Sequence, residues 1–104
     1  MAVCDVCSRS VNPSDCYALT TKQVATDERY WQYMLGNYAY NDEALAMVVQ
    51  QQAMQRSGWL ICEQCSDMFS FDRGAAKNYA RRMVDPPGSG PVDMQAVAVA
   101  AARA

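Results

Sequence analysis

The sequence Cys4-Asp5-Val6-Cys7 and its counterpart Cys62-Glu63-Gln64-Cys65 are the two stretches that decide the fold of this 104-residue chain. Each is a CxxC turn, which places two sulfur atoms on one side of a tight loop, close enough to share a metal ion. Two such turns supply four soft anionic ligands in a tetrahedron, the arrangement preferred by a closed structural Zn²⁺ site. We therefore expect one structural zinc ion to be held by Cys4, Cys7, Cys62 and Cys65.

The spacing between the two turns is long for a zinc site. Fifty-four residues separate Cys7 from Cys62, whereas a minimal zinc ribbon has roughly 15–20. A helical insertion between the turns explains this spacing. Closing a longer loop adds only about 0.6 kcal/mol for each doubling of its length, and zinc binding to finger peptides supplies about 10–16 kcal/mol.

Three other interpretations of the cysteines stay open at this point. The pairs could be redox-active dithiols, although the acidic residues inside both motifs would raise the pKa of the thiols rather than lower it. They could bind iron through the same four ligands, or they could be buried free cysteines. The fifth cysteine, Cys16, could be a spare ligand, a redox partner or a small core residue, and the last role is the commonest for such a cysteine.

Patterns along the chain predict an α+β domain. The stretch Tyr17–Val24 is rich in β-branched and aromatic residues and predicts a strand, as does the short apolar run 59–61 that leads into Cys62. An apolar stripe predicts a helix that begins near Thr26, and Asn41 can cap a second helix that ends at about Arg56. Another stripe predicts a helix after Cys65 that ends at the turn 85–88; the two stripes are Trp31, Met34, Leu35, Tyr38 and Ala76, Tyr79, Ala80, Met83.

This order of elements, with a CxxC turn, a strand, an insertion, a strand that ends in CxxC and then a helix, resembles a treble-clef zinc finger, with the zinc ribbon as the nearest rival. The resemblance implies a zinc-stabilised β-hairpin with a helical insertion and a C-terminal helix. We expect a zinc-binding domain over residues 1–85, with the insert at about 27–57. Residues 86–104 would form a Pro/Gly linker and an alanine-rich tail, which either frays or docks as a helix.

Composition excludes several classes of function. The chain has no histidine, which removes the usual general base, the Ser-His and Cys-His nucleophile pairs and the imidazole zinc sites, so we expect no enzymatic activity. The net charge of −2 and pI near 4.8 disfavour general nucleic-acid binding. We expect no signal peptide and no membrane span, and a cytoplasmic location in which thiols stay reduced.

The function that remains is a protein–protein interaction or accessory module, with the insert or the tail as the contact surface; a homodimer is one form this contact could take. Tyr30, Tyr33 and Tyr40 lie off the apolar stripe and are candidates for exposed contacts. The first alternative is a nucleic-acid-associated regulator that uses the basic helix face of Arg73, Lys77, Arg81 and Arg82, a pattern that is more often an ordinary solvated face. The second alternative is a thiol redox protein.

Overall fold

The computed structural model describes residues 2–55 and 58–104 of the chain. It combines helices with two small antiparallel sheets, which confirms the α+β class. The elements in chain order are β1 (Ala2–Val3), β2 (Ser10–Val11), the 3₁₀ helix η1 (Pro13–Asp15), β3 (Cys16–Leu19), α1 (Thr21–Ala25), α2 (Glu28–Asn37), α3 (Asp42–Ala53), β4 (Trp59–Cys62), α4 (Glu63–Ser66), α5 (Arg73–Arg82) and α6 (Met94–Arg103).

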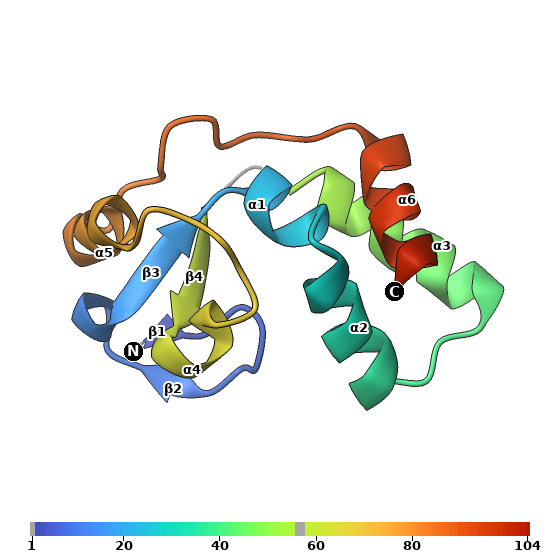
Figure 1. Ribbon diagram of the computed structural model, residues 1–104, viewed down its shortest axis with the longest axis horizontal. Coiled ribbons are helices and arrows are strands. Elements are labelled where there is room, and N and C mark those ends of the chain that lie inside the picture. The colour runs from blue at the N-terminus through green and yellow to red at the C-terminus, as the bar shows by residue number, and fades with distance from the viewer. Residues whose placement is uncertain (1, 56–57) are drawn as a thin grey trace.

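The elements form two halves that lie side by side (Figure 1). One half holds all four strands together with η1, α4 and α5, and the other holds α1, α2, α3 and α6. The segment that follows α5 crosses from the first half to the second along the top of the view. The alanine-rich end of the chain, which was expected either to fray or to dock, is the helix α6. This helix packs against α2 and α3.

The strands β3 and β4 pair as an antiparallel ladder, although α1, α2 and α3 separate them in the sequence. Cys16 lies opposite Cys62, and Leu19 lies opposite Trp59. The strand predicted at 59–61 is confirmed and extends to Cys62, so β4 delivers the second CxxC turn directly to the end of this ladder. Helix α5 covers β3 and makes the most extensive contact between any two elements.

The strand predicted over Tyr17–Val24 is wrong in its second half, because β3 ends at Leu19 and α1 begins at Thr21. Thr20 and Gln23 form a capping box: the Thr20 hydroxyl accepts from the Gln23 backbone N–H, and the Gln23 side chain accepts from the Thr20 N–H. The T-x-x-Q pattern for this cap is present in the sequence. The local hydrogen bonds therefore outweigh the β propensity of the two threonines.

The two helices predicted in the insertion are confirmed as α2 and α3. Asp27 caps α2 by accepting from the Arg29 N–H, and Asn41 caps α3 by accepting from the Ala44 N–H. Helix α3 ends at Ala53, and the predicted end at Arg56 lies outside the described residues. Over the part of the chain that is described, no helix combines the length and the apolar character needed to cross a membrane.

The roles expected for two tyrosines are reversed in the structure. Tyr30 was a candidate for exposed contact but is only 1% exposed, because its ring packs edge-on against Trp31 and Trp59. Tyr38 was expected in the core but is 49% exposed, because α2 ends one residue before it and the stripe does not continue. Tyr33 and Tyr40 are half-buried. The i, i+3, i+4, i+7 spacing of apolar residues indicates a buried helix face only while the helix continues.

The two halves are joined by aromatic rings and by one buried hydroxyl. The Tyr30 ring of α2 lies 5.6 Å from the Trp59 ring of β4. The Trp59 indole N–H donates to the Thr21 hydroxyl over 3.1 Å, and this hydroxyl donates to the Gln55 carbonyl oxygen over 3.1 Å. Thr21 is fully buried, so its single oxygen connects β4, α1 and the end of the insertion away from water.

Replacing Thr21 with valine should test this connection. The change keeps the shape of the side chain but leaves the buried Trp59 N–H without its acceptor, so we expect a loss of about 1–3 kcal/mol in the free energy of unfolding. Urea denaturation of the metal-loaded protein measures this. The control is Thr26→Val, whose exposed hydroxyl bonds to the Lys22 carbonyl and whose loss should change stability by less than about 0.5 kcal/mol. Equal midpoints for the two variants would contradict the assignment.

Candidate metal centre

The four cysteines of the two CxxC turns meet at one place in the structure. Their sulfur atoms all lie within 4.8 Å of one another, and the Sγ atoms of Cys7 and Cys62 are 3.8 Å apart. A tetrahedron with Zn–S bonds of about 2.3 Å has edges of about 3.8 Å. The four sulfurs could therefore hold a metal ion with little movement, and the donor set suits a thiophilic metal.

The first turn lies at the tip of the small β1–β2 hairpin. The Cys4 N–H donates to the Arg9 carbonyl and the Ser8 N–H donates to the Cys4 carbonyl, both over 2.9 Å. Ser8 has a φ of 62°, in the left-handed region, and this allows the chain to reverse directly after Cys7. The turn thus places both sulfurs on the side that faces the second CxxC.

The second turn joins a strand to a helix. Cys62 is the last residue of β4 and the N-cap of α4, and Cys65 lies in the first turn of that helix. The Cys65 N–H donates to the Cys62 sulfur over 3.5 Å. The Cys62 sulfur therefore caps α4, and the same short turn brings the sulfurs of Cys62 and Cys65 close together.

Asp5, inside the first CxxC, ties the two turns together. Its backbone N–H donates to the Leu60 carbonyl over 2.8 Å, and its carboxylate accepts from the Leu60 N–H over 2.7 Å. Next to this clamp, the Cys62 N–H donates to the Cys4 sulfur over 3.4 Å. The first turn is thereby fixed to the outer edge of β4, two residues before the second pair of ligands.

The thiols differ in how readily they ionise. Burial raises the pKa of the Cys4 thiol and of the Cys65 thiol, although backbone hydrogen bonds act against the rise at Cys4. At Cys7 burial also opposes ionisation, but hydrogen bonds from the Arg9 backbone and from the other thiols outweigh it and lower its pKa. Because a metal ion binds thiolates, its binding must release protons from Cys4 and Cys65 in particular.

Cys16 stands apart from this cluster. It is buried, and its thiol donates to the Asn12 carbonyl over 3.3 Å. Burial, followed by the charges of Cys4 and Cys62, raises the pKa of Cys16 to about 11. Within residues 2–55 and 58–104, the group of potential metal ligands contains the four CxxC cysteines and not Cys16, so the structure agrees with Cys16 as a small core residue.

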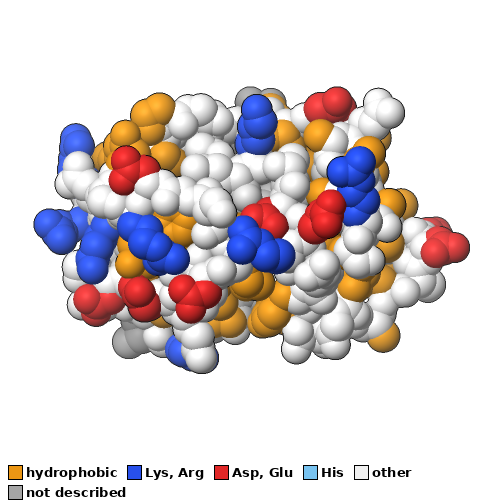
Figure 2. Space-filling model, viewed as in Figure 1, with side chains coloured by type: hydrophobic (Ala, Val, Ile, Leu, Met, Phe, Trp, Pro, Cys, Tyr) orange, Lys and Arg blue, Asp and Glu red, His pale blue; other side chains and the backbone are white. Residues whose placement is uncertain are grey.

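The four basic residues singled out in the sequence lie on α5 but do not form one free face. The Arg73 guanidinium stacks over the rings of Tyr17 and Phe71, at 5.3 and 5.0 Å from their centroids, and donates to the Ser66 hydroxyl. The Lys77 ammonium lies 6.0 Å from the Tyr17 ring. Figure 2 shows Lys and Arg side chains gathered over this half of the molecule with Asp and Glu side chains beside them. Arg73, Arg81 and Arg82 are exposed and Lys77 is half-buried.

Comparison of the chain with protein-family models, with curated proteins and with solved structures gave no match. The candidate site therefore depends on its own geometry. The spacing of the cysteines was sufficient to predict that the four sulfurs meet, but it gave no reason to single out Asp5 or Leu60. Because Leu60 is 55 residues away from Asp5, no local pattern pointed to this clamp.

Replacing Asp5 with alanine should loosen the site without removing a ligand. The Leu60 N–H loses its carboxylate acceptor, and we expect a loss of about 1 kcal/mol in the free energy of unfolding together with faster loss of the metal to a chelator. Stopped-flow release of metal to a colorimetric chelator, with urea denaturation alongside, checks both. The control is Asp67→Ala, which removes an 84%-exposed carboxylate on α4's C-terminal side. If both variants released the metal at the wild-type rate, the clamp would have no role in holding it.

Proposed function

We propose that Cys4, Cys7, Cys62 and Cys65 hold one Zn²⁺ ion and that the ion is structural. The observation that carries this proposal is the meeting of four sulfurs from two turns within 4.8 Å. Four protein ligands complete a tetrahedron and leave no position for water or substrate, which is the property that separates structural from catalytic zinc sites. When bound, the ion would supply a cross-link between the β1–β2 hairpin and the start of α4.

We further propose that the fold is treble-clef-like. Three features support this: the first ligand pair lies in a hairpin turn, the second pair lies at the start of a helix, and an antiparallel ladder precedes that helix. The long insertion between β3 and β4 is the departure from a simple zinc finger. The five cysteines are free thiols in the structure, which suits a reducing compartment such as the cytoplasm.

The role we propose for the module is contact with another protein. A cavity of about 500 Å³ lies between α3 and α6 and has apolar walls that include Leu45, Val49 and Ala98. Met94, which also lines it, is a large apolar side chain that is 53% exposed. A largely apolar surface of this kind, with the charged Asp42 in its lining, is typical of a protein contact surface, and a second copy of this chain is one partner that could occupy it.

The two alternatives have less support from the contacts. A nucleic-acid surface on α5 would use Arg73 and Lys77, but both already lie over the Tyr17 ring. A redox role would need an accessible dithiol pair; Cys7 is half-buried and has a lowered pKa, but its pair partner Cys4 and both thiols of the second turn are buried. The apolar α3–α6 surface therefore remains the better candidate for function.

Elemental analysis tests the metal part of the proposal. The protein purified under reducing conditions without added metal should contain one zinc per chain, and a strong chelator should remove it with loss of the folded near-ultraviolet circular dichroism. All five thiols should then react with a maleimide, whereas those of the loaded protein should react slowly. Protein that is folded and free of metal, or one with iron in place of zinc, would refute the assignment.

Site-specific photo-crosslinking tests the contact surface. A benzophenone amino acid replaces Met94 on the apolar surface or Arg81 on the basic helix, and the protein is irradiated in the cells that naturally make it. We expect a defined protein adduct from position 94, either of twice the chain's mass or with another protein. Position 81 is the matched control. Adducts with nucleic acid at position 81, with none at position 94, would favour the regulator alternative instead.

A further inference from the structure

The backbone N–H and C=O of Ala18 point away from β4, toward the free edge of β3. Ala18 lies opposite Leu60 in the β3–β4 ladder, and both the N–H and the C=O of Leu60 are already bonded to Asp5 on the other side of β4. In an antiparallel strand the N–H and C=O of one residue point to the same side. Ala18 and Leu60 are therefore a non-hydrogen-bonded pair, and the N–H and C=O of Ala18 point to the outer edge of β3.

These two backbone groups have no protein partner within residues 2–55 and 58–104. The neighbouring outward groups do have one, since the Cys16 N–H donates to the Pro13 carbonyl and the Thr20 N–H donates to the Gln23 side chain. Ala18 is only 8% exposed. Backbone groups that are this well buried are nearly always paired, so an acceptor and a donor are expected beside Ala18.

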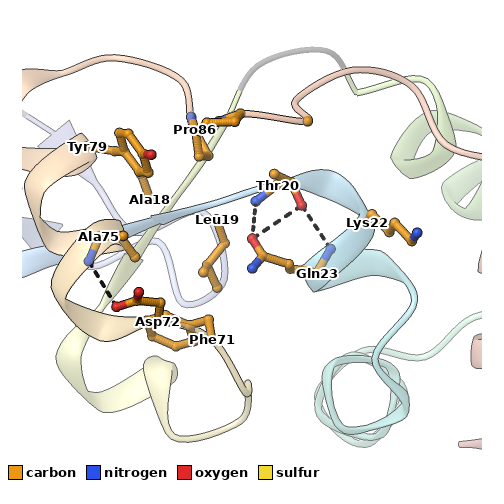
Figure 3. Close-up of a pocket in the computed structure, with 13 residues that line it drawn as sticks. Ala18, Leu19, Thr20, Lys22, Gln23, Phe71, Asp72, Ala75, Tyr79 and Pro86 are labelled. Carbon is orange, nitrogen blue, oxygen red and sulfur yellow. Dashed lines mark hydrogen bonds between the residues drawn. The ribbon is translucent and has the colours of Figure 1, made fainter.

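A cavity of about 320 Å³ lies where these partners would sit (Figure 3). It is lined by Ala18, Leu19 and Thr20 in succession. Because the side chains of consecutive strand residues point to opposite faces, a cavity that touches all three runs along the strand edge rather than over one face. Helix α5 and the segment that contains Pro86 form its other walls.

Three polar side chains of the cavity are engaged with the protein, whereas Lys22, which also lines it, is exposed. Thr20 and Gln23 bond to each other in the capping box, and the Asp72 carboxylate accepts from the Ala75 N–H (Figure 3). The rest of the lining is largely apolar and includes Phe71 and Tyr79. The cavity thus offers one backbone donor, one backbone acceptor and a largely apolar space, with Lys22 and Tyr79 as further polar groups in its wall.

We propose that this cavity binds an extended peptide segment of a partner protein. One residue of the segment would accept from the Ala18 N–H through its C=O and donate to the Ala18 C=O through its N–H, as in the addition of a strand to a sheet edge. Its apolar side chain would fill the space beside Phe71 and Tyr79. This inference rests on the proposed function as a protein-contact module and adds a second contact site, distinct from the α3–α6 surface.

The geometry limits the contact to a single residue pair. Cys16 and Thr20, the next residues in line for strand addition, already have partners for their N–H groups. A volume of about 320 Å³ is at the lower end of small-ligand pockets, which span about 300–1,000 Å³. The segment should therefore bind weakly through this pair alone and should be selected for one apolar side chain.

The smallest probe that carries both groups is N-acetyl-leucine N-methylamide. Titrated into the zinc-loaded, ¹⁵N-labelled protein, it should shift the Ala18 amide resonance saturably, and with it those of Leu19, Thr20 and Tyr79. The matched control is the same compound with a methyl group on the leucine nitrogen, which removes the donor to Ala18. We expect the control to bind about tenfold more weakly, or worse, because it leaves the Ala18 C=O without a partner.

Two variants separate this contact from general stability. Ala18→Pro removes the N–H that should receive the probe, and proline is tolerated where the N–H does not face the ladder, so the protein should keep its zinc and fold but lose binding. Ala75→Phe fills the cavity from α5 and should also abolish binding, whereas Ala96→Phe, at an exposed position of α6, should not.

The inference is overturned if the probe leaves the Ala18 resonance unmoved up to its solubility limit. It is also overturned if the N-methyl control binds equally well, or if well-folded Ala75→Phe protein binds as the wild type does. Zinc content and crosslinking from position 94 are measured on the same preparations. Their persistence would show that the proposed function stands although the peptide site does not.

Discussion

The meeting of the two CxxC turns at the end of the β3–β4 ladder is the constraint on which the rest of the structure depends. Each turn alone supplies two sulfurs, the first from the tip of a hairpin and the second from a strand–helix junction. Together they place four sulfurs within 4.8 Å, and the Asp5–Leu60 hydrogen bonds hold them there from one side. Burial raises the pKa of the Cys4 and Cys65 thiols, so a metal that binds them as thiolates would release their protons.

The insertion between the turns is a packed body rather than a long loop. Helix α6, from the far end of the sequence, closes it by packing on α2 and α3, and the Val92 N–H bonds to the Ala53 carbonyl at the place where the two segments meet. The insertion contacts the half that holds the four CxxC cysteines through Tyr30, Trp59 and the Thr21 hydroxyl. A wide separation of ligand pairs is therefore compatible with a small fold, because the intervening chain has its own core and brings the ends of β3 and β4 together.

The sequence predicted those features that depend on local spacing and failed where partners come from far away. Two CxxC motifs, the cap at Asn41 and the helical periods were sufficient to locate the cluster of four cysteines, α2 and α3. The strand predicted through Thr20 and Thr21 was wrong because a capping box competes with β propensity. Tyr30 was misplaced because Trp59, which covers it, lies in another element. Asp5 could not be assigned, since its partner Leu60 is 55 residues away.

The Asp5–Leu60 pairing has one more consequence, which links the metal centre to the opposite edge of the sheet. By occupying both backbone groups of Leu60, it decides which residues of β4 bond to β3, and therefore that Ala18 rather than Tyr17 or Leu19 faces outward. A shift of one residue in this register would bring the Tyr17 and Leu19 backbone groups to the free edge and turn their side chains to the opposite face. The same hydrogen bonds that align the ligands thus also set the chemistry of the cavity along β3.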